Sequence, residues 1–364
     1  MKIPNLRQML RNTKEHPGRN RLAQSVVEKV QPQVNPFSKN GRGLLAEVKG
    51  ELSSVTPTLE SEDKDLAAKL VDELSRVIEG EVHFETSYKA MYSTDASNYR
   101  QIPVGVVLVR SADDMIRTVE ICRKYRVPVL SRGGGTSLCG QCCNAAVVMD
   151  TSKYFNRILE LNYEEKYARV QPGVVLDTLR NRAEEKHLTF APDPSTHNHC
   201  TLGGMIGNNS CGTHSVMGGV TADNVYELDV LLYDGTRMTV GRTSDEEYAR
   251  IIAAGGRKAE IYKKLRNFVD KYADLIRAKF PKLKRRVSGY DLTALLPENG
   301  FDIARALVGS ESTLVTVLEA RVRLVPSPRK RSVVVLGYPD IFSAGDHVPE
   351  IMKFGPIALE GLDD

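Results

Sequence analysis

The sequence predicts an α+β protein in which strands and helices alternate after a helical N-terminal extension. Short β-branched runs such as VGVVLV and AAVVMD have the length and composition of strands. Between such runs lie segments with one apolar face and a capping pattern, which are typical of helices. Residues 1 to about 75, in contrast, are highly charged and poor in strand signals.

The composition narrows the class of protein. A chain of 364 residues that is 41% hydrophobic is long enough for roughly two or three domains with ordinary cores. Its apolar runs fall far below the ~20 residues of a membrane span, and the N-terminus lacks a signal-peptide core. With 50 basic and 46 acidic residues, the net charge of +4 gives no case for nucleic acid as the main partner. We therefore expect a cytoplasmic protein without an integral membrane span; a peripheral position at the inner face of the membrane is compatible with this.

The first predicted strands surround a helix and a glycine-rich loop. VGVVLV, from Val104 to Val109, predicts a strand. The next segment, SADDMIRTVEICRKYR, predicts a helix that begins at Ser111, with Asp114 completing a capping box. The apolar face of this helix consists of Met115, Ile116, Val119 and Cys122. YRVPVL and AAVVMD then predict two strands, one on each side of the loop SRGGGTSLCGQCC.

Later segments continue the alternation. YARVQPG predicts a strand and VVLDTLRNRAEEKHL predicts a helix. The run from Cys200 to Gly219 has no convincing periodicity, and a loop of this length inside a compact domain is usually functional or disordered. NVYELDVLLYDGTRMTV predicts a hairpin whose turn is at Asp234 and Gly235.

Two helices and a change of unit follow. One helix is expected over 244–254, where Ser244 and Glu247 form another capping box, and a second helix over 257–279. ARVRLVPSPRK predicts a strand that runs into a proline-marked boundary near 326–330. RSVVVLGYP then begins a new unit with a strand.

These changes of pattern predict four segments. They are an N-terminal helical extension (1–78), two strand-and-helix subdomains (79–150 and 151–330) and a short final unit (331–364). A strand and part of a helix cannot bury a core by themselves. We therefore expect the final unit to be the truncated beginning of a further domain.

The loop between the third and fourth strands carries groups that suit a diphosphate. Its glycines let backbone N–H groups approach a ligand, while an arginine adds charge and two hydroxyls add donors: Arg132, Gly133, Gly134, Gly135, Thr136 and Ser137. The order of residues is neither a P-loop nor a dinucleotide fingerprint. A plain glycine-rich connection between strands remains the alternative for this loop alone.

A second segment repeats this chemistry between positions 192 and 225. It contributes six glycines, Gly203, Gly204, Gly207, Gly212, Gly218 and Gly219, and the short polar side chains of Asn208, Asn209, Ser210 and Ser215. Two loops rich in accessible backbone suit one large ligand that makes many hydrogen bonds. We therefore expect the two segments to hold one ligand from two sides.

Several motifs occur together and in order: PVLSRGGGTSLCGQ, ARVQPGVVLDTL, APDPST, CTLGGMIGNNS, TADNVYELDVLLYDG, SGYDLTALL and GSESTLVTVLEARVRLVP. Over about residues 80–364 the chain thus resembles FAD-linked oxidases of the vanillyl-alcohol oxidase type, which carry a p-cresol methylhydroxylase-type (PCMH-type) FAD domain. Within this family it is most similar to the D-lactate, glycolate and D-2-hydroxyglutarate dehydrogenases, including long forms with an iron–sulfur unit. The resemblance implies two α+β subdomains that hold FAD between them, with a separate substrate cap.

The resemblance also implies where the cofactor lies. Residues Arg132 to Ser137 would line the FAD diphosphate, and Gly140 and Gln141 would also bind the cofactor. The ribityl and isoalloxazine side would be formed by Pro194, Ser195, Gly203, Gly204, Asn208, Asn209 and Ser210, with Gly212 and Ser215 close by. Glu311 and Val317 would approach the adenosine end. Where many relatives have a G-T-L-G run, this chain has Ser312-Thr313-Leu314-Val315, so the backbone approach there is expected to differ.

The implied reaction is the oxidation of a D-2-hydroxy acid to the 2-oxo acid, with FAD accepting a hydride. Electrons would then pass to a quinone, an electron-transfer protein or an iron–sulfur domain. The basic cap residues and the late G-D-G-N-x-H motif of such relatives are absent from this sequence. Catalytic residues are therefore not assigned; Arg285, Arg286 and Tyr290 are candidates for contact with an anionic substrate or with the flavin. An FAD-binding protein without turnover is the alternative function.

Other interpretations of the histidines and cysteines remain open. His197, His199, Cys200, Cys211 and His214 have side chains that bind zinc. Cys139, Cys142 and Cys143 include a C-x-x-C spacing without a second pair at a zinc-like distance, and small residues beneath the cofactor are the favoured reading. All six cysteines lie between Cys122 and Cys211, which indicates reduced thiols in one domain. No metal site is predicted; His197, His199 and Cys139 are conceivable points of covalent flavin attachment, although the resemblance implies FAD without a bond.

Overall fold

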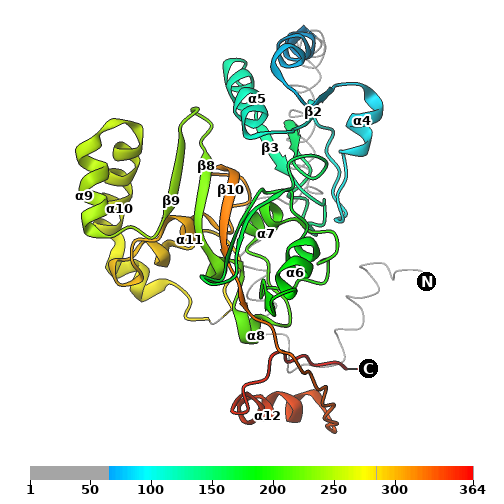
Figure 1. Ribbon diagram of the computed structural model, residues 1–364, viewed down its shortest axis with the longest axis vertical. Coiled ribbons are helices and arrows are strands. Elements are labelled where there is room, and N and C mark those ends of the chain that lie inside the picture. Colours follow the sequence, from blue (N-terminus) through cyan, green and yellow to red (C-terminus); the bar gives the residue numbers. More distant parts are fainter. Residues whose placement is uncertain (1–64, 284, 364) are drawn as a thin grey trace, which may run out of the picture. The chain divides into compact units, whose positions relative to one another are not determined.

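The computed structural model describes residues 65–283 and 285–363 of the chain. The chain divides into one unit that ends at Asp65 and another that begins at Leu66, and Figure 1 labels the elements of the second unit. The part of the expected N-terminal extension before residue 65 therefore lies outside the described residues. The remaining part, from Leu66, belongs to the same unit as all the strands.

The first sheet has four strands in the order β1-β2-β4-β3. Their bounds are β1 Glu81–His83, β2 Gly105–Leu108, β3 Val129–Arg132 and β4 Val147–Asp150. β4 pairs in parallel with both β2 and β3, whereas β1 is antiparallel to β2. Every residue of β2 and β4 is buried, as expected for parallel strands covered on both faces.

Two helices and a preceding helical segment cover this sheet. On one face Val107 and Met149 share a core with Met115 of α5 (Ala112–Lys124) and with Leu70 and Leu74, which lie in helical residues 66–77. On the other face the sheet packs against tyrosines that include Tyr88 and Tyr92, in and just after α4 (Thr86–Met91). Leu70 and Leu74 are completely buried, so the boundary of this body lies before the position 78 expected from the sequence.

The capping box expected at α5 is only half formed. The Ser111 hydroxyl accepts the N–H of Asp114 at 3.2 Å, as predicted. The Asp114 carboxylate, however, accepts the N–H groups of Glu79, Gly80 and Arg110 at 2.8–3.1 Å. It therefore ties the approach to β1 to the end of β2 instead of returning to Ser111.

The second sheet has five strands in the order β5-β6-β10-β8-β9, and all neighbours are antiparallel. The bounds are β5 Ile158–Asn162, β6 Tyr167–Val170, β8 Val225–Leu231, β9 Arg237–Gly241 and β10 Thr316–Arg323. The β8–β9 hairpin turns at Asp234 and Gly235, as predicted, and Gly235 has a φ of +89°. A short ribbon pairs β7 (Leu188–Thr189) with β11 (Val325–Pro326).

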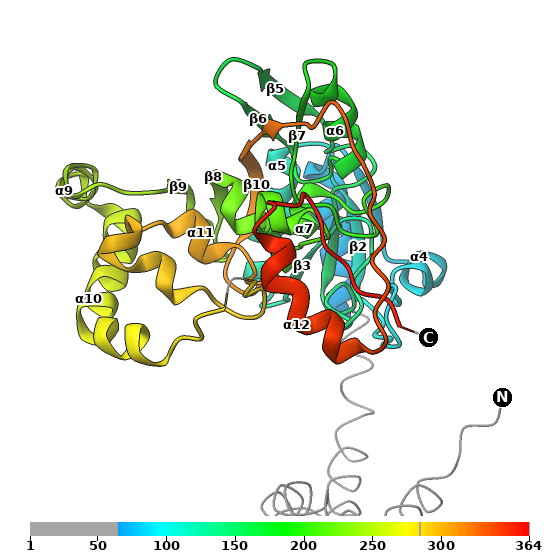
Figure 2. The ribbon, with the colours of Figure 1, turned by 90° about the horizontal axis from the view of Figure 1, so that it is seen from below.

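The helices associated with the second sheet are α6 Leu176–Glu184, α7 Leu202–Asn208, α8 Ser215–Gly218, α9 Asp245–Ala254, α10 Gly256–Lys279 and α11 Ile303–Leu307. The 3₁₀ turns are η2 Thr221–Asn224, η3 Leu292–Leu295 and η4 Pro297–Asn299. The predictions of helices over 244–254 and 257–279 are confirmed, and Ser244 caps α9 by accepting the N–H of Glu247. Figure 2 shows α9 and α10 together on the side of the molecule that carries β9.

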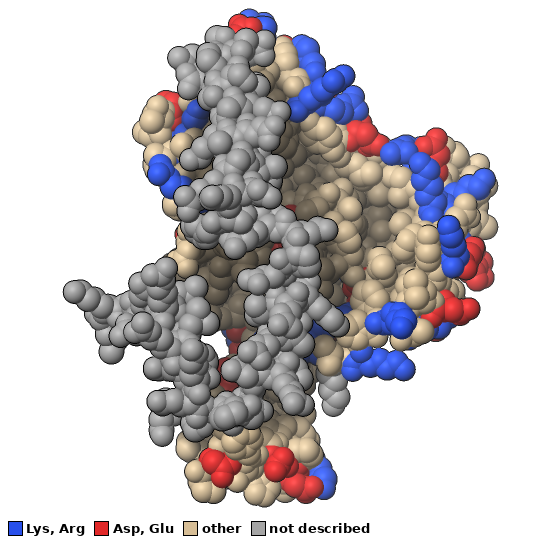
Figure 3. Space-filling view, turned by 180° about the vertical axis from the view of Figure 1, so that it is seen from behind, with Lys and Arg blue, Asp and Glu red and all other residues tan. Residues whose placement is uncertain are grey.

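The α9–α10 hairpin carries a mixed charge pattern. Arg250, Arg257 and Arg277 each pair with a carboxylate three residues away on the same helix. Figure 3 shows basic and acidic side chains interspersed on this side of the molecule. Such alternation is typical of a solvated helical face and does not form a uniformly basic surface.

Two sequence-based expectations are wrong. The run from Cys200 to Gly219, expected to be a loop, contains α7 and α8. The strand expected in RSVVVLGYP is not formed among the described residues: Val333 and Val335 are 91% and 89% exposed and pair with no strand there. A strand needs a partner for its backbone groups, and α12 (Ile341–Met352), the next element, offers no strand edge and buries no residue of its own.

Candidate functional site

The two glycine-rich segments meet at one cavity of about 320 Å³. A third segment, which leads into β10, completes its wall. In Figures 1 and 2, α7 lies beside both β3 and β10, so the cavity lies where the two sheets approach each other. The lining residues are 130–139, 141, 142, 151, 172, 194–196, 200, 201, 203–208, 210, 211, 307, 310–312, 315 and 317.

Most of the residues expected to bind the cofactor line this cavity. They are Arg132, Gly133, Gly134, Gly135, Thr136, Ser137, Gln141, Pro194, Ser195, Gly203, Gly204, Asn208, Ser210, Glu311 and Val317. Four others, Gly140, Asn209, Gly212 and Ser215, lie outside the lining. Sequence reasoning did not assign Thr201 or Cys211 to the cofactor, and it named Gly207 only as one of the six glycines of the second segment; all three also line the cavity. Gly207 lies one helical turn after Gly203 and Gly204, a spacing that would have pointed to it had α7 been expected.

The first glycine loop packs against the second segment with no room for side chains. A Cβ atom on Gly133 would lie 2.0 Å from the hydroxyl of Thr201. One on Gly134 would lie 2.3 Å from the carbonyl oxygen of His199, and Gly135 has a φ of +64°. These glycines are therefore required by the contact between two parts of this chain as well as by any ligand.

Arg132 holds the first loop from its outer side. Its guanidinium donates to the carbonyl oxygens of Tyr92, Thr94 and Cys142 at 3.3, 2.8 and 3.0 Å. It also lies over the Tyr92 ring, 5.1 Å from its centroid. The positive charge expected to face a diphosphate is thus already engaged with backbone oxygens, and its main contribution is to fix the loop.

The glycine-rich helix α7 is stabilised by burial and by its caps. Leu202, Met205 and Ile206 enter the core of the second sheet. The Thr201 hydroxyl accepts the N–H of Gly204 at 3.3 Å, and Asn209 ends the helix in the left-handed region at a φ of +56°. Burial and capping together offset the low helix propensity of three glycines.

The opposite face of α7 is open toward the cavity. A Cβ atom on Gly207 would meet nothing closer than the Glu311 carboxylate at 3.8 Å, and one on Gly204 would meet only the Thr201 hydroxyl at 3.4 Å. A Cβ atom on Gly203, in contrast, would lie only 2.6 Å from the Cβ of Pro172. A methyl group at position 204 or 207 would therefore collide with no other part of the protein. The two glycines leave this space in the cavity empty.

The third segment joins the C-terminal end of α7. The N–H groups of Gly309 and Glu311 donate to the carbonyl oxygens of Ile206 and Gly207 at 2.9 and 3.0 Å. Glu311 and Ser312 have φ angles of +50° and +60°, a region that favours glycine. The different backbone approach expected at Ser312 stays a prediction from the sequence.

Glu311 connects three sides of the cavity. Its carboxylate accepts the side-chain N–H of Asn208 at 3.0 Å and lies 3.5 Å from the side-chain nitrogen of Gln141. Burial raises the pKa of the Glu311 carboxyl, and the bond from Asn208 opposes this increase. Among the lining residues only Glu311 and Arg132 carry a formal charge.

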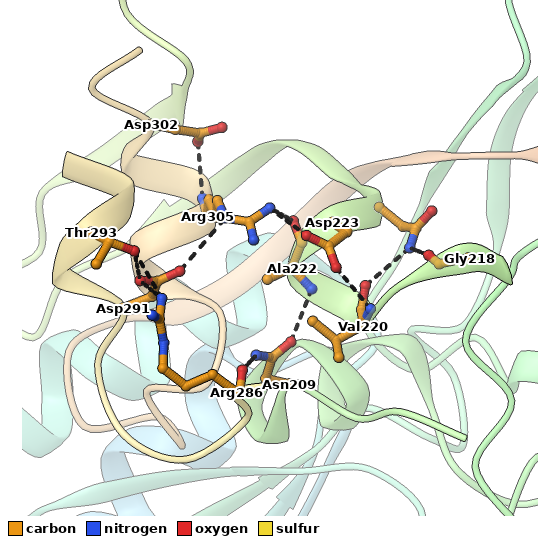
Figure 4. Close-up of polar contacts among 11 residues, drawn as sticks. Asn209, Gly218, Val220, Ala222, Asp223, Arg286, Asp291, Thr293, Asp302 and Arg305 are labelled. Atoms are coloured by element: carbon orange, nitrogen blue, oxygen red, sulfur yellow. Dashed lines mark hydrogen bonds and ion pairs between the residues drawn. The ribbon is translucent and has the colours of Figure 1, made fainter. Parts of the chain in front are cut away.

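The candidate catalytic residues lie outside the lining. Figure 4 shows Arg286 bound to Asp291 and to Thr293, in a network that continues through Arg305 to Asp223. Asn209 joins this network to the second glycine segment, since its amide contacts the Arg286 carbonyl at 3.4 Å and the Ala222 N–H at 2.9 Å. Arg286 thus acts within a structural network.

Arg285 and Tyr290 have different surroundings. The exposed Arg285 guanidinium donates to the Cys211 sulfur at 2.8 and 3.1 Å, and Cys211 lines the cavity. The Tyr290 hydroxyl lies 2.7 Å from that of Thr313. Of the three candidates, only Arg285 touches a residue of the cavity wall.

The histidines of the second segment are held separately. His197 pairs with Asp177 and His214 with Asp193, both at 2.7 Å, while His199 contacts Asn198. No group of three metal-binding side chains occurs in residues 65–283 and 285–363. The zinc interpretation therefore gains no support from the geometry.

The six cysteines are free thiols, as expected. Burial raises the pKa of Cys142 and of Cys200 to about 11, so both remain protonated at neutral pH. Cys139, in contrast, is exposed at the cavity. Within the same described ranges, no helix is both long and apolar enough to cross a membrane.

Comparison with known families identifies the domain. Residues 103–241, which include both glycine segments, match the FAD binding domain family. The chain contains an FAD-binding domain. The match confirms the PCMH-type FAD domain expected from the sequence and FAD as its cofactor, and the similarity to a solved structure confirms the α+β fold. Alkyldihydroxyacetonephosphate synthase shares the fold, with a TM-score of 0.51, 18% identity and coverage of 72% of this chain and 41% of that protein.

Curated relatives extend the similarity beyond this domain. The chain is 35% identical to D-2-hydroxyglutarate dehydrogenase of Pseudomonas putida over 78% of its own length. It is 34% identical to glycolate oxidase subunit GlcD of Bacillus subtilis over 82%, and 26% identical to mitochondrial D-lactate dehydrogenase (cytochrome) of Kluyveromyces lactis over 83%. The chain spans 29%, 53% and 46% of these three relatives, respectively.

The lining chemistry suits FAD. Gly204 and Gly207 leave open a surface that a single Cβ would fill. The buried Ser131 hydroxyl at the cavity has no protein partner, which is costly unless a ligand or water satisfies it. Backbone N–H groups and hydroxyls are the donors that a diphosphate accepts.

Proposed function

We propose that this protein is an FAD-dependent oxidoreductase that oxidises a D-2-hydroxy acid to the 2-oxo acid. The observation that carries the proposal is the meeting of the two glycine-rich segments at one cavity within an FAD-binding domain. Relatives named D-2-hydroxyglutarate dehydrogenase and glycolate oxidase favour this substrate class. Bound FAD would supply the acceptor for the hydride from the carbon that bears the hydroxyl.

The protein's own residues would position the cofactor. In this proposal the first glycine loop, fixed by Arg132, offers backbone N–H groups to the diphosphate. Pro194 and Ser195 border the flavin side, and Glu311 and Val317 the adenosine side. A second cavity of about 360 Å³ shares Ser312 and Val315 with the first and offers further space at that adenosine side. The two subdomains, 79–150 and 151–330, would then contribute one wall each.

Arg285 is the residue that we propose for contact with an anionic substrate. Its guanidinium donates to the Cys211 sulfur and pairs with no carboxylate among the described residues, whereas that of Arg286 is paired with Asp291. We propose no general base, because the lining residues offer no histidine and only one carboxylate. The electron acceptor, whether a quinone, an electron-transfer protein or an iron–sulfur domain, and the cytoplasmic location remain predictions from the sequence.

The proposal is tested by the absorption spectrum of the purified chain. We expect a flavin spectrum, before or after reconstitution with FAD, that bleaches on anaerobic addition of D-2-hydroxyglutarate, D-lactate or glycolate. The L-enantiomers of the first two acids serve as controls. A colourless protein that cannot be reconstituted would contradict the cofactor site. A coloured protein that no hydroxy acid bleaches would contradict the activity and favour the alternative, an FAD-binding protein without turnover.

A further inference from the structure

The charge of the cavity is unusual for a site that accepts a diphosphate. Its lining contains one arginine and one glutamate as formally charged side chains. Arg132 is occupied by three backbone carbonyls. Arg285, which lies outside the lining, donates to the sulfur of Cys211 on the cavity wall. The charged group that is left to face a ligand in the cavity is therefore the Glu311 carboxylate.

Glu311 is held inside the cavity by contacts from several elements. Its backbone N–H donates to the carbonyl oxygen of Gly207 near the end of α7. Its carboxylate accepts a hydrogen bond from the side-chain amide of Asn208 in α7 and lies near the side-chain amide of Gln141 in the first loop. Both side-chain neighbours are neutral amides. The other titratable groups of the lining are the thiols of Cys139, Cys142, Cys200 and Cys211. No cation balances the carboxylate among these neighbours.

The diphosphate of FAD carries a negative charge on each phosphate throughout the neutral pH range. Two like charges in one partly desolvated cavity repel each other, and the weaker acid responds by binding a proton. Burial already favours the neutral form of Glu311 before a dinucleotide enters. A neutral carboxyl also gains an O–H donor, which an anion can accept.

We propose that Glu311 takes up a proton when FAD binds, so that the protein holds FAD more tightly as the pH falls. This inference rests on the proposed position of the FAD diphosphate in the cavity. It assigns to Glu311 a role that goes beyond contact with the adenosine side: the residue couples cofactor retention to pH.

The first test measures the FAD dissociation constant of the full chain between pH 6 and pH 8.5 by quenching of flavin fluorescence. We expect the affinity to fall by up to about tenfold per pH unit between the pKa of Glu311 in the free protein and its higher pKa in the complex, and to level off on either side. Glu311→Gln, which keeps the size and cannot ionise, should bind FAD tightly with no such slope. Glu319→Gln is the matched control, because Glu319 of β10 pairs with Arg169 of β6 and lies outside the cavity lining. It should keep the slope of the unmodified protein.

A second measurement needs no variant. Calorimetric titration of the unmodified protein with FAD in two buffers of different ionisation enthalpy, Tris and HEPES, should show uptake of up to about one proton per FAD near neutral pH. Riboflavin, which lacks the phosphates, should bind without proton uptake.

Three results would overturn the inference. An FAD affinity of the unmodified protein that does not change with pH would exclude coupled protonation. Weaker FAD binding by Glu311→Gln at every pH would instead make the carboxylate an acceptor for a hydroxyl of the dinucleotide. A chain that binds no FAD at any pH would overturn the cofactor site as well, whereas the first two results leave that site intact.

Discussion

The two glycine-rich segments contain the same residue for different reasons. In the first loop, Gly133 and Gly134 lie against Thr201 and His199 so closely that any Cβ atom would collide with them. In α7, Gly204 and Gly207 have room for a Cβ atom within the protein and lie on the cavity wall. Gly133 and Gly134 allow the two segments to pack against each other, whereas Gly204 and Gly207 leave a surface of the cavity free for the cofactor.

This difference separates folding from binding. A substitution in the first loop disturbs the contact between the two segments and hence the cavity as a whole. A substitution on the open face of α7 changes only the space available to a ligand. The number of glycines does not distinguish the two cases. The atoms that a Cβ would meet at each glycine position do distinguish them.

The largest effect is expected for Gly134→Val. Its Cβ would lie 2.3 Å from the His199 carbonyl, and its two methyl groups need still more room. We expect a destabilisation of about 3 kcal/mol and loss of FAD. Urea unfolding and the flavin content of the purified protein measure both. Gly337→Val is the control, because nothing lies within 4 Å of a Cβ at Gly337. Normal stability together with normal flavin content would contradict the requirement for glycine at 134.

A smaller effect is expected when the first loop loses its anchor. Arg132→Gln leaves the carbonyls of Tyr92, Thr94 and Cys142 without their donor and should cost about 2 kcal/mol and at least about tenfold in FAD affinity. Arg132→Lys keeps the positive charge, but a single ammonium group cannot replace the planar guanidinium that reaches three carbonyl oxygens. We therefore expect a similar loss of stability and of FAD affinity. FAD affinity retained in the lysine variant would show that the charge acts directly on the phosphates.

The parts of the fold with a local signal were predictable from the sequence. The β8–β9 hairpin follows from Asp234 and Gly235, and the start of α9 from Ser244. α7 was not predicted, because its glycines disfavour a helix and its stability comes from a core formed by distant strands. The strand expected near Val334 was wrong for the opposite reason: strong strand propensity without a partner strand in the described residues.

The site was predictable in position more than in detail. The meeting of the two glycine segments was expected, since both carried the same backbone chemistry. The contacts of Arg132 and Arg286 were not, because a sequence does not show which acceptor a guanidinium will reach. The roles proposed for Arg285 and Glu311 depend on their neighbours in the structure. Arg285 contacts Cys211, and the carboxylate of Glu311 contacts Asn208.

Gly207→Ala sharpens the comparison from the side of α7. Alanine favours a helix over glycine by about 0.5–1 kcal/mol, and the new methyl group makes only an ordinary contact of 3.8 Å with Glu311. We expect equal or higher thermal stability of the protein without FAD, together with about tenfold weaker FAD binding. Gly204→Ala should behave alike. Unchanged FAD affinity in both variants would remove this face of α7 from the cofactor site.

The smallest effect concerns the stability of the protein without FAD, where the third segment meets α7. Burial raises the pKa of Glu311 above its ordinary value of 4.5, so the folded state holds this proton more tightly than the unfolded state. The resulting stabilisation is present below the ordinary pKa and is lost as the pH rises through the raised one. Because glutamine never ionises, Glu311→Gln should raise the melting temperature by about 1–2 °C at pH 7.5 and not at pH 4. The shift is small because Glu311 is only partly buried, so that solvent screens its charge. An equal shift at both pH values would point to packing rather than charge as its cause.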